Sequence, residues 1–319
     1  MKKIWIIGAS TMAVEYTKVL KALDRDFCVI GRGLTNAAIF EQKTGITPIT
    51  GGLDAFLDTK PEIPSHVIVA VGVEQLCPTA NSLLKYGIKN ILLEKPGALT
   101  VDELELTEKL AFSNRANVFI AYNRRFYSSV LKAEEIIKED GGVSSFNFEF
   151  TEWAHTIKPD HRPIALFNHW LIANSTHVID TAFFLGGEPK EMSCYKAGEG
   201  NIEWHPSGSV YVGAGISKKG ALFSYQANWQ APGRWAVEIL TRKHRLYLKP
   251  METLQIQDIG SVRVNPVELD DTLDKEFKPG FYLQTEAFLS DCPNRLCTLE
   301  EQIRHIEDIY YKINPNYRQ

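Results

Sequence analysis

The sequence lacks the features that mark several large classes of protein. No apolar run approaches the roughly 18 residues that a membrane-spanning helix needs. No strong excess of one charge occurs either, because the formal net charge is -4 and the isoelectric point is near 6.1. These values give no electrostatic reason to expect nucleic acid or an anionic membrane surface as a partner. The sequence therefore predicts a protein that binds neither nucleic acid nor membranes.

Cysteine is scarce, and its spacing argues against a disulfide framework or a zinc site. The chain has 5 cysteines, of which only Cys292 and Cys297 lie close together, and no histidine spacing completes a metal site around them. The sequence also has no HExxH motif, no CxxC motif and no carboxylate cluster. We therefore expect no metal, and reduced thiols in a cytoplasmic protein. The first apolar run is broken by Gly8 and Ser10, so it fits a β-strand better than a signal peptide.

The first part of the chain alternates between strand-like and helix-like segments. Residues 3–7, 66–71 and 89–93 are short apolar stretches, and residues 79–86 are one of the helical segments between them. Strands that are apolar throughout are typical of a parallel sheet covered on both faces. The chain is also long enough, at 319 residues, for two ordinary domains. We predict an α/β Rossmann domain with a doubly wound parallel sheet over residues 1–122.

The pattern changes in the rest of the chain. Residues 144–153 and 209–230 alternate between apolar and polar side chains, as strands of an antiparallel sheet with one covered face do, and KKG at 218–220 suits a hairpin turn. We predict an α+β substrate-binding and oligomerisation domain over residues 123–319, built on an open, mostly antiparallel sheet. A last helix over residues 299–312 either belongs to it or packs back on the first domain. An open sheet needs cover, so we expect a homodimer or homotetramer.

The first strand–helix turn, GASTMA at residues 8–13, matches part of a dinucleotide-binding motif. Gly8 and the last alanine fit G-x-G-x-x-G/A, but Ser10 replaces the glycine that lets the backbone approach a pyrophosphate. Ser10 is small, and its hydroxyl is able to donate to a phosphate or to cap the helix. We therefore expect Gly8, Ser10, Thr11 and Met12 to bind a cofactor. A tight turn with a serine cap in an ordinary α/β protein is the alternative.

The end of the second strand bears on which cofactor binds. Sites for NAD usually have an acidic residue there, bonded to the ribose 2′-hydroxyl. CVIGRG at residues 28–33 has no acid and offers Arg32, which suits a 2′-phosphate. We therefore expect NADP(H) to be favoured over NAD(H). A solvated loop arginine is the alternative.

EKP at residues 94–96 follows the apolar strand ILL. The carboxyl end of a parallel strand lies where doubly wound sheets bind ligands, so Glu94 and Lys95 are expected to face a ligand. Partial burial would lower the pKa of Lys95 and suit it to donate to a reacting oxygen. Pro96 fixes the next backbone bond, and a cis peptide is compatible with such a turn. The alternative is a surface ion pair at a strand end.

Two later stretches add candidate residues. NRRF at 123–126 begins where the next strand ends and places Asn123, Arg124 and Arg125 at the expected domain junction. Residues 168–187 read as a helix that ends at two glycines. His177 and Asn174 share one face of this helix, which is otherwise rich in small and apolar residues, so we expect them to line a pocket.

Together these stretches resemble the glucose–fructose oxidoreductase, inositol dehydrogenase and rhizopine catabolism (Gfo/Idh/MocA) superfamily over nearly the whole chain. The resemblance rests on the turn at Gly8, VGVEQLCPTA at 71–80, EKP, NRRF and the histidine helix. It implies that Lys95 and His177 move the substrate proton. It also implies that Glu94 lies beside the nicotinamide ribose, that Gly72 and Val73 lie along the cofactor, and that residues 123–125 line the cofactor and the substrate.

One departure from the family pattern concerns the acid/base histidine. Many members have D-x-G-x-H, where this chain reads ANSTH, so that Ala173 takes the place of the aspartate. Either its contribution is missing or Asn174 supplies it. Since an amide carries no charge, it cannot raise the pKa of His177 as an anion would.

Substrate selectivity is expected to come from the second domain. TEWAHTIKPDHRP at 151–163 and NWQAPGRW at 228–235 supply aromatic and cationic side chains that suit a sugar with an anionic group, such as a nucleotide sugar. The ordinary alternative for the tryptophans is core packing. With those from the preceding stretches, the expected substrate-binding residues are Arg124, Arg125, Trp153, His155, Asn174, Trp229 and Arg234.

We thus expect an NAD(P)-dependent oxidoreductase that transfers hydride between nicotinamide and a carbon of a sugar, polyol or nucleotide sugar. Three alternatives stay open. They are an NAD-dependent glycosidase of the same superfamily, a non-catalytic NADP(H)-binding regulator, and a biliverdin-reductase-like enzyme with a non-sugar substrate.

Overall fold

The computed structural model describes residues 3–159, 162–290 and 293–318. The chain forms two compact units. The first comprises Met1–Asn123 and Leu273–Ile303, and the second comprises Arg124–Thr272 and Arg304–Gln319. The continuous domain expected over residues 123–319 differs from the second unit because residues 273–303 return to the first. This return depends on contacts between segments far apart in sequence, which local patterns do not record.

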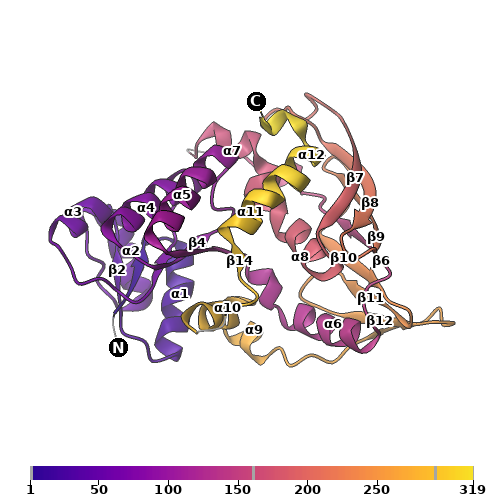
Figure 1. The fold of residues 1–319 in the computed structure, drawn as a ribbon, viewed down its shortest axis with the longest axis horizontal. Coiled ribbons are helices and arrows are strands. Elements are labelled where there is room, and N and C mark those ends of the chain that lie inside the picture. The colour runs from indigo at the N-terminus through magenta and orange to yellow at the C-terminus, as the bar shows by residue number, and fades with distance from the viewer. Residues whose placement is uncertain (1–2, 160–161, 291–292, 319) are drawn as a thin grey trace. The chain divides into compact units, whose positions relative to one another are not determined.

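The first unit is built on a six-stranded sheet in the order β14-β5-β4-β3-β1-β2. Figure 1 shows its helices α1 to α5 in indigo to purple. The pairs among β1 to β5 are parallel, and β14 is antiparallel to β5. The elements in chain order are β1 Ile4–Ile7, α1 Thr11–Ala22, β2 Phe27–Ile30, α2 Leu34–Thr44, α3 Gly52–Asp58, β3 Val67–Val69, α4 Val73–Tyr86, β4 Asn90–Glu94, α5 Val101–Asn114, β5 Asn117–Ala121, α9 Thr272–Glu276, α10 Phe281–Leu289, β14 Cys297–Thr298 and α11 Leu299–His305.

The strands at the centre of this sheet are buried along their whole length. Every residue of β1 and β3 is buried, as expected for strands with helices on both faces. α4 ends at Gly87, whose φ of 108° is the left-handed conformation of a helix C-cap. The prediction of a Rossmann domain with a parallel sheet is confirmed.

The second unit is built on an eight-stranded sheet in the order β13-β12-β11-β10-β6-β9-β8-β7. All of its pairs are antiparallel except β6 with β9, which confirms the predicted open, mostly antiparallel sheet. Its elements are η1 Asn123–Phe126, α6 Ser128–Glu139, β6 Ser145–Glu149, η2 Ala154–Thr156, α7 Ile164–Asn168, η3 Leu171–Ser175, α8 Thr176–Gly186, β7 Pro189–Ala197, β8 Val210–Ser217, β9 Leu222–Asn228, β10 Ala236–Leu240, β11 His244–Leu248, β12 Gln255–Asp258, β13 Val264–Pro266, η4 Ile306–Tyr310, α12 Tyr311–Ile313 and η5 Pro315–Arg318.

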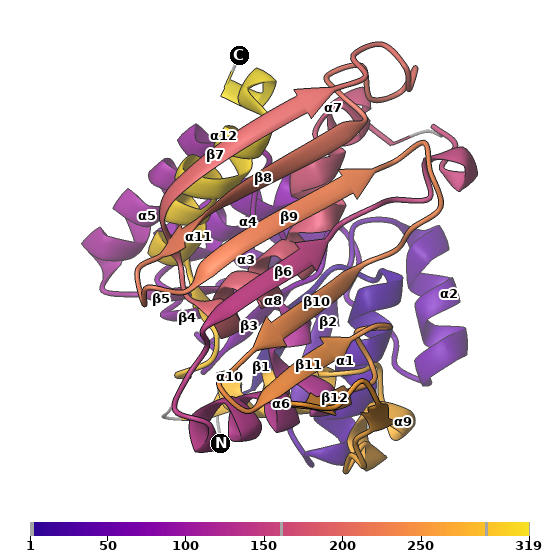
Figure 2. The same ribbon diagram turned by 90° about the vertical axis from the view of Figure 1, so that its right-hand side faces the viewer.

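Helix α8 packs on one face of this sheet, behind the strands in the view of Figure 2. The ring of Phe183 meets Phe146 of β6 and Phe223 of β9 edge to face, with centroids 5.8 and 5.1 Å apart. The contact is close enough to require Gly186, since a Cβ there would lie 2.3 Å from the Phe146 ring. The helix that carries His177 is therefore fixed against the sheet at its C-terminal end.

The other local predictions agree with the structure in their main points. The KKG turn joins β8 to β9, where Ser217 N donates to Ala221 O at 2.8 Å. The expected last helix runs through α11, η4 and α12, and η4 is a π-helical segment. The four cysteines that the structure describes are free, and Cys292 lies outside the described residues.

Candidate functional site

The first strand–helix turn of the first unit is built against the end of β3. Gly8 has φ of 112°, and a Cβ on it would lie 2.3 Å from the carbonyl oxygen of Ala70, so no other residue fits without a shift of the backbone. Ser10 caps α1: its Oγ accepts a hydrogen bond from Ala13 N at 3.4 Å and donates to Ala70 O at 2.9 Å. The hydroxyl of Ser10 therefore points into the turn and serves as the cap that the sequence allowed.

The residues around this turn fit a dinucleotide. Thr11 is exposed and Met12 half-buried at the first turn of α1, which contains no acidic residue, and backbone amides at a helix N-terminus attract phosphate. Arg32 is exposed just past β2, where no acid stands. Gly72 caps α4 and Val73 begins it, so these two residues follow β3 at the same end of the sheet as Gly8.

Glu94 lies at the carboxyl end of β4 in a hydrogen-bonded chain. Its Oε1 accepts from the hydroxyl of Tyr16 at 2.9 Å, and that hydroxyl accepts from Nε2 of Gln284 at 3.2 Å. Burial raises the pKa of the Glu94 carboxyl, against the hydrogen bond from Tyr16 and the positive charges of Lys95 and Lys278, which lower it. Neither Tyr16 nor Gln284 was predicted as a site residue. In the sequence Tyr16 looks like one more apolar residue of α1, and no local pattern connects it with Gln284, which lies far along the chain.

The turn that follows Glu94 is held from the returning segment as well. Nε2 of Gln302 donates to the carbonyl of Pro96 at 2.9 Å, and the hydroxyl of Tyr122 donates to Oε1 of Gln302 at 3.1 Å. The Lys95–Pro96 peptide bond is cis. Lys95 is half-buried on this turn. Asn123, the last residue of the first segment of this unit, donates from Nδ2 to Pro279 O at 2.8 Å.

The second unit contains a buried carboxylate, Glu152, that was not among the predicted site residues. Glu152 is 2% exposed. It accepts hydrogen bonds from Nδ2 of Asn174, at 3.1 Å to each oxygen, and from Oγ of Ser175 at 2.6 Å. Arg234 lies 4.0 Å away. Burial raises the pKa of Glu152 against the lowering effect of these partners.

Glu152 bears directly on the missing aspartate of the ANSTH stretch. Ala173, in the aspartate's place, is buried, and the next two residues hold a carboxylate that comes from the segment after β6. These residues belong to η3, a π-helical segment that leads directly into α8, and such segments often occur at functional sites. The carboxylate near the histidine helix is thus supplied from elsewhere in the chain.

Several of the predicted residues lie around the indole of Trp235 or next to Arg234, which contacts it. We call this group the Trp235 cluster: Arg124, Trp153, His177, Arg234 and Trp235. The guanidinium carbons of Arg124 and Arg234 lie 4.8 and 4.9 Å from the Trp235 ring centroid. The ring of His177 lies 6.1 Å from it. Arg234 also lies 4.7 Å from the centroid of Trp153, which is 49% exposed.

Two other predicted substrate-binding residues are engaged in the core of the unit, and a third is exposed. Arg125 is buried and forms a paired contact with Asp180, with Nε to Oδ2 at 2.9 Å and a second nitrogen to Oδ1 at 2.6 Å. Trp229 is buried against His205, with ring centroids 4.7 Å apart, so it packs as a core residue. His155 is exposed on η2.

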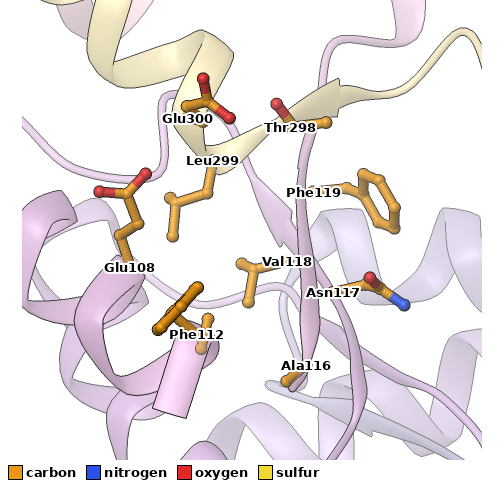
Figure 3. A pocket seen from close by; sticks show the side chains of 10 residues that line it. Glu108, Phe112, Ala116, Asn117, Val118, Phe119, Thr298, Leu299 and Glu300 are labelled. Atoms are coloured by element: carbon orange, nitrogen blue, oxygen red, sulfur yellow. The ribbon is translucent and has the colours of Figure 1, made fainter. Parts of the chain in front are cut away.

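A pocket of about 210 Å³ in the first unit lies away from the turns described above (Figure 3). Leu299 and Phe112 line it, together with Asn117, Val118 and Phe119 of β5. These are the first residues of β5, at the opposite end of the strand from Ala121, which pairs with Glu94. The pocket is therefore separate from the candidate site. Within the part of the chain that the structure describes, no helix is both long and apolar enough to cross a membrane.

No protein-family model matches the chain, and no curated protein matches it in sequence. Solved structures do. Levoglucosan dehydrogenase, in complex with NADH and L-sorbose, is 16% identical, with 99% of this chain and 97% of that chain covered and a TM-score of 0.77. UDP-N-acetylglucosamine 3-dehydrogenase GnnA from Acidithiobacillus ferrooxidans is 14% identical, with 100% and 99% covered and a TM-score of 0.74.

An oxidoreductase from Agrobacterium radiobacter in complex with NAD+, L-tartaric acid and magnesium is 12% identical, with 98% and 96% covered and a TM-score of 0.74. The chain has the fold of the Gfo/Idh/MocA-type oxidoreductases. The resemblance seen in the sequence is thus confirmed for the fold.

Proposed function

We propose that this protein is an NAD(P)-dependent oxidoreductase that transfers hydride between nicotinamide and a carbon of a sugar, polyol or nucleotide sugar. The observation that carries the proposal is the turn at Glu94, Lys95 and Pro96. It follows a central parallel strand at the same end of the sheet as the first turn at Gly8, and Tyr16 and Gln302 hold it from two sides. Dehydrogenases of sugars and nucleotide sugars share the fold.

Bound at this end of the sheet, the nicotinamide would supply or accept the hydride. Gly8, Ser10, Thr11 and Met12 would form the turn that receives its phosphates, and Gly72 and Val73 would lie along it. Glu94 and Asn123 would bind near the nicotinamide side. Lys95 would donate a hydrogen bond to the reacting oxygen of the substrate and share in the transfer of its proton.

In the second unit, His177 would act as the partner acid or base. Asn174 and Trp153 would contact the sugar, with Glu152 fixing the amide of Asn174 through its two hydrogen bonds. Arg125 and Trp229 would not contact the sugar, because the partners of both side chains lie in the core of the unit. They would support the region by packing.

The preference between cofactors is a separate proposal. Arg32 is exposed at the end of β2, where an NAD site would have an acid, so we propose that NADP(H) is favoured over NAD(H). Arg32→Ala is expected to weaken NADPH about 10- to 100-fold, the value of a hydrogen bond to a charged group, and to leave NADH unchanged. Lys43→Ala, at an exposed position of α2, is the control. Equal loss for both nucleotides would contradict the preference.

We also propose a homodimer or homotetramer formed through the open sheet face (Figure 2). On that face, Tyr195, Val212 and Gln226 form a row across β7, β8 and β9, and Leu222 lies on the same side. Tyr195 and Leu222 are 68% and 62% exposed, although both are large and apolar. Light scattering should report a dimer or tetramer that Tyr195→Glu with Leu222→Glu converts to monomers. A monomeric wild type would contradict the proposal.

The function is tested by supplying the purified protein with each oxidised and reduced nicotinamide nucleotide and a panel of sugars, polyols and nucleotide sugars. A net change in nicotinamide absorbance, matched by an equal amount of oxidised or reduced sugar, supports the proposal. Release of a free aglycone from a glycoside without net nicotinamide change indicates the glycosidase. Tight nucleotide binding without turnover of any compound indicates the regulator.

A further inference from the structure

Two guanidinium groups in the second unit share one indole ring. The carbons of Arg124 and Arg234 lie 4.8 and 4.9 Å from the centroid of Trp235. Arg124 also lies 5.6 Å from the centroid of Tyr127, and Arg234 lies 4.7 Å from that of Trp153. Stacking of this kind holds a guanidinium flat and leaves its N–H groups to donate in the plane. Three aromatic rings therefore position two cations around one indole.

The acidic groups nearby do not pair with both cations. Glu152 is 4.0 Å from Arg234, but its oxygens already accept from Asn174 and Ser175. Among the described residues, no acceptor meets the buried Nε of Arg124. Glu152 and the exposed Glu252 act on Arg124 only through their longer-range charge, which the positive charge of Arg234 opposes.

A buried donor without a partner is costly unless a ligand completes it. Here the donor belongs to a guanidinium that shares the Trp235 ring with a second one, and guanidinium groups bind carboxylates and phosphates through two parallel hydrogen bonds. Trp153, beside Arg234, is half exposed and offers an aromatic face of the kind that apolar faces of sugar rings contact.

We propose that Arg124 and Arg234 bind an oxyanion of the substrate, so that the protein acts on a sugar that carries a carboxylate or a phosphate. That the bound sugar is a substrate rests on the proposed function, whereas the oxyanion site itself does not depend on it. A sugar acid and a phosphorylated or nucleotide sugar both offer the required oxygens.

The test measures ligand binding without nicotinamide nucleotide, by titration calorimetry. The probes are inorganic phosphate, D-glucuronate, D-glucose 1-phosphate and UDP-glucose, with D-glucose as the neutral reference. The proteins are wild type, Arg124→Gln, Arg234→Gln and a matched control, Arg242→Gln, which removes the same charge from an exposed position in the same unit. Circular dichroism melts establish that each variant is folded.

Wild type is expected to bind at least one anionic probe ten times or more tightly than D-glucose. Both arginine variants should lose at least tenfold in that affinity, while Arg242→Gln loses none. Glucuronate in first place identifies a sugar acid, and the phosphates in first place identify a phosphorylated or nucleotide sugar. If Arg124→Gln fails to fold, Arg234→Gln, whose side chain is 47% exposed, carries the test.

Equal binding of D-glucose and the anions overturns the proposal, as does binding of no anion or full retention of anion affinity in the arginine variants. Fluorescence titration of the same preparations with NADH and NADPH keeps the two claims apart. Nucleotide binding without anion selectivity overturns the oxyanion site alone. Anion selectivity without nucleotide binding overturns the oxidoreductase alone.

Discussion

Each unit contains a glutamate whose pKa burial raises, Glu94 in the first and Glu152 in the second, and the two differ in what surrounds the charge. Glu94 has cations at hand, in Lys95 beside it in sequence and Lys278, and one hydroxyl bonded to it. Glu152 accepts hydrogen bonds from neutral donors, Asn174 and Ser175, and its cation, Arg234, lies farther away, at 4.0 Å.

The difference points to two roles. A carboxylate next to a lysine tunes the charge and proton affinity of that lysine, whereas a carboxylate that accepts from an amide and a hydroxyl fixes where these groups point. We therefore expect changes around Glu94 to act on the chemical step and changes around Glu152 to act on sugar binding.

The largest effect is expected from Lys95→Ala. If Lys95 takes part in proton transfer, turnover should fall about 10²- to 10⁴-fold, while the dissociation constants of the nucleotides stay unchanged. Steady-state kinetics and fluorescence titration measure the two quantities. Lys89→Ala, which alters a lysine at the opposite end of β4, is the control. Turnover at the wild-type rate in Lys95→Ala would show that Lys95 takes no part in the chemical step.

A third buried titratable group, His205, is expected to make the stability of the protein depend on pH. Burial lowers the pKa of His205 from 6.5 to about 4, so the folded protein keeps it neutral while the unfolded chain protonates it. Stability is therefore expected to fall by about 3 kcal/mol as the pH drops from about 6.5 to 4.

Urea denaturation at several pH values between these limits measures this loss. His205→Phe, which keeps a ring among Trp204, Trp229 and Tyr317, should remove this component of the pH dependence even if it lowers stability at neutral pH. His155→Phe, at an exposed position, should leave the dependence as in wild type. An unchanged pH dependence in His205→Phe would show that other groups cause it.

A matched pair of substitutions, Glu152→Gln and Glu94→Gln, tests the contrast directly. Glutamine keeps one acceptor oxygen but replaces the other with an amide group that donates, and the partners of both glutamates are donors as well. Each substitution should therefore lower kcat/KM about tenfold, which corresponds to ~1.4 kcal/mol. For Glu152→Gln we expect the loss in KM for the sugar. For Glu94→Gln we expect it in kcat. The same split between kcat and KM in both variants would contradict the two roles.

The smallest effect is expected from Tyr16→Phe. It deletes the hydroxyl whose hydrogen bond lowers the pKa of Glu94, so that pKa should rise further and the acid limb of the kcat profile should move to higher pH. Stability should fall by about 1 kcal/mol. Tyr86→Phe loses a comparable bond, to Pro61 O at 2.7 Å, and should leave the profile unmoved. An equal shift of the kcat profile in both variants would show that the hydrogen bond from Tyr16 to Glu94 does not cause the shift.

The parts of the fold that the sequence predicted are those whose signal is local. Central strands such as β1 and β3 are buried on both faces, so they appear as apolar runs. Glu94 and Lys95 were found because they stand together directly after such a run. Glu152 was missed because its partners, Asn174 and Ser175, follow more than twenty positions later, and no local pattern joins the two segments.

The direction of a side chain was equally hidden in the sequence. Arg124 and Arg125 are neighbours with the same chemistry, yet one stacks on Trp235 and the other is buried against Asp180. The two tryptophans differ in a similar way, because Trp229 stacks on His205 whereas the ring of Trp235 faces the guanidinium of Arg234. The return of residues 273–303 to the first unit also depends on long-range contacts, such as that of Gln284 with Tyr16.

The most direct test of the central claim is fluorescence titration of the purified protein with NADPH and NADH. We expect saturable binding at the carboxyl end of the first sheet, tighter for NADPH, and retained in Lys95→Ala. Binding of neither nucleotide would contradict it, and would leave Glu94 and Lys95 as a structural ion pair at the end of β4.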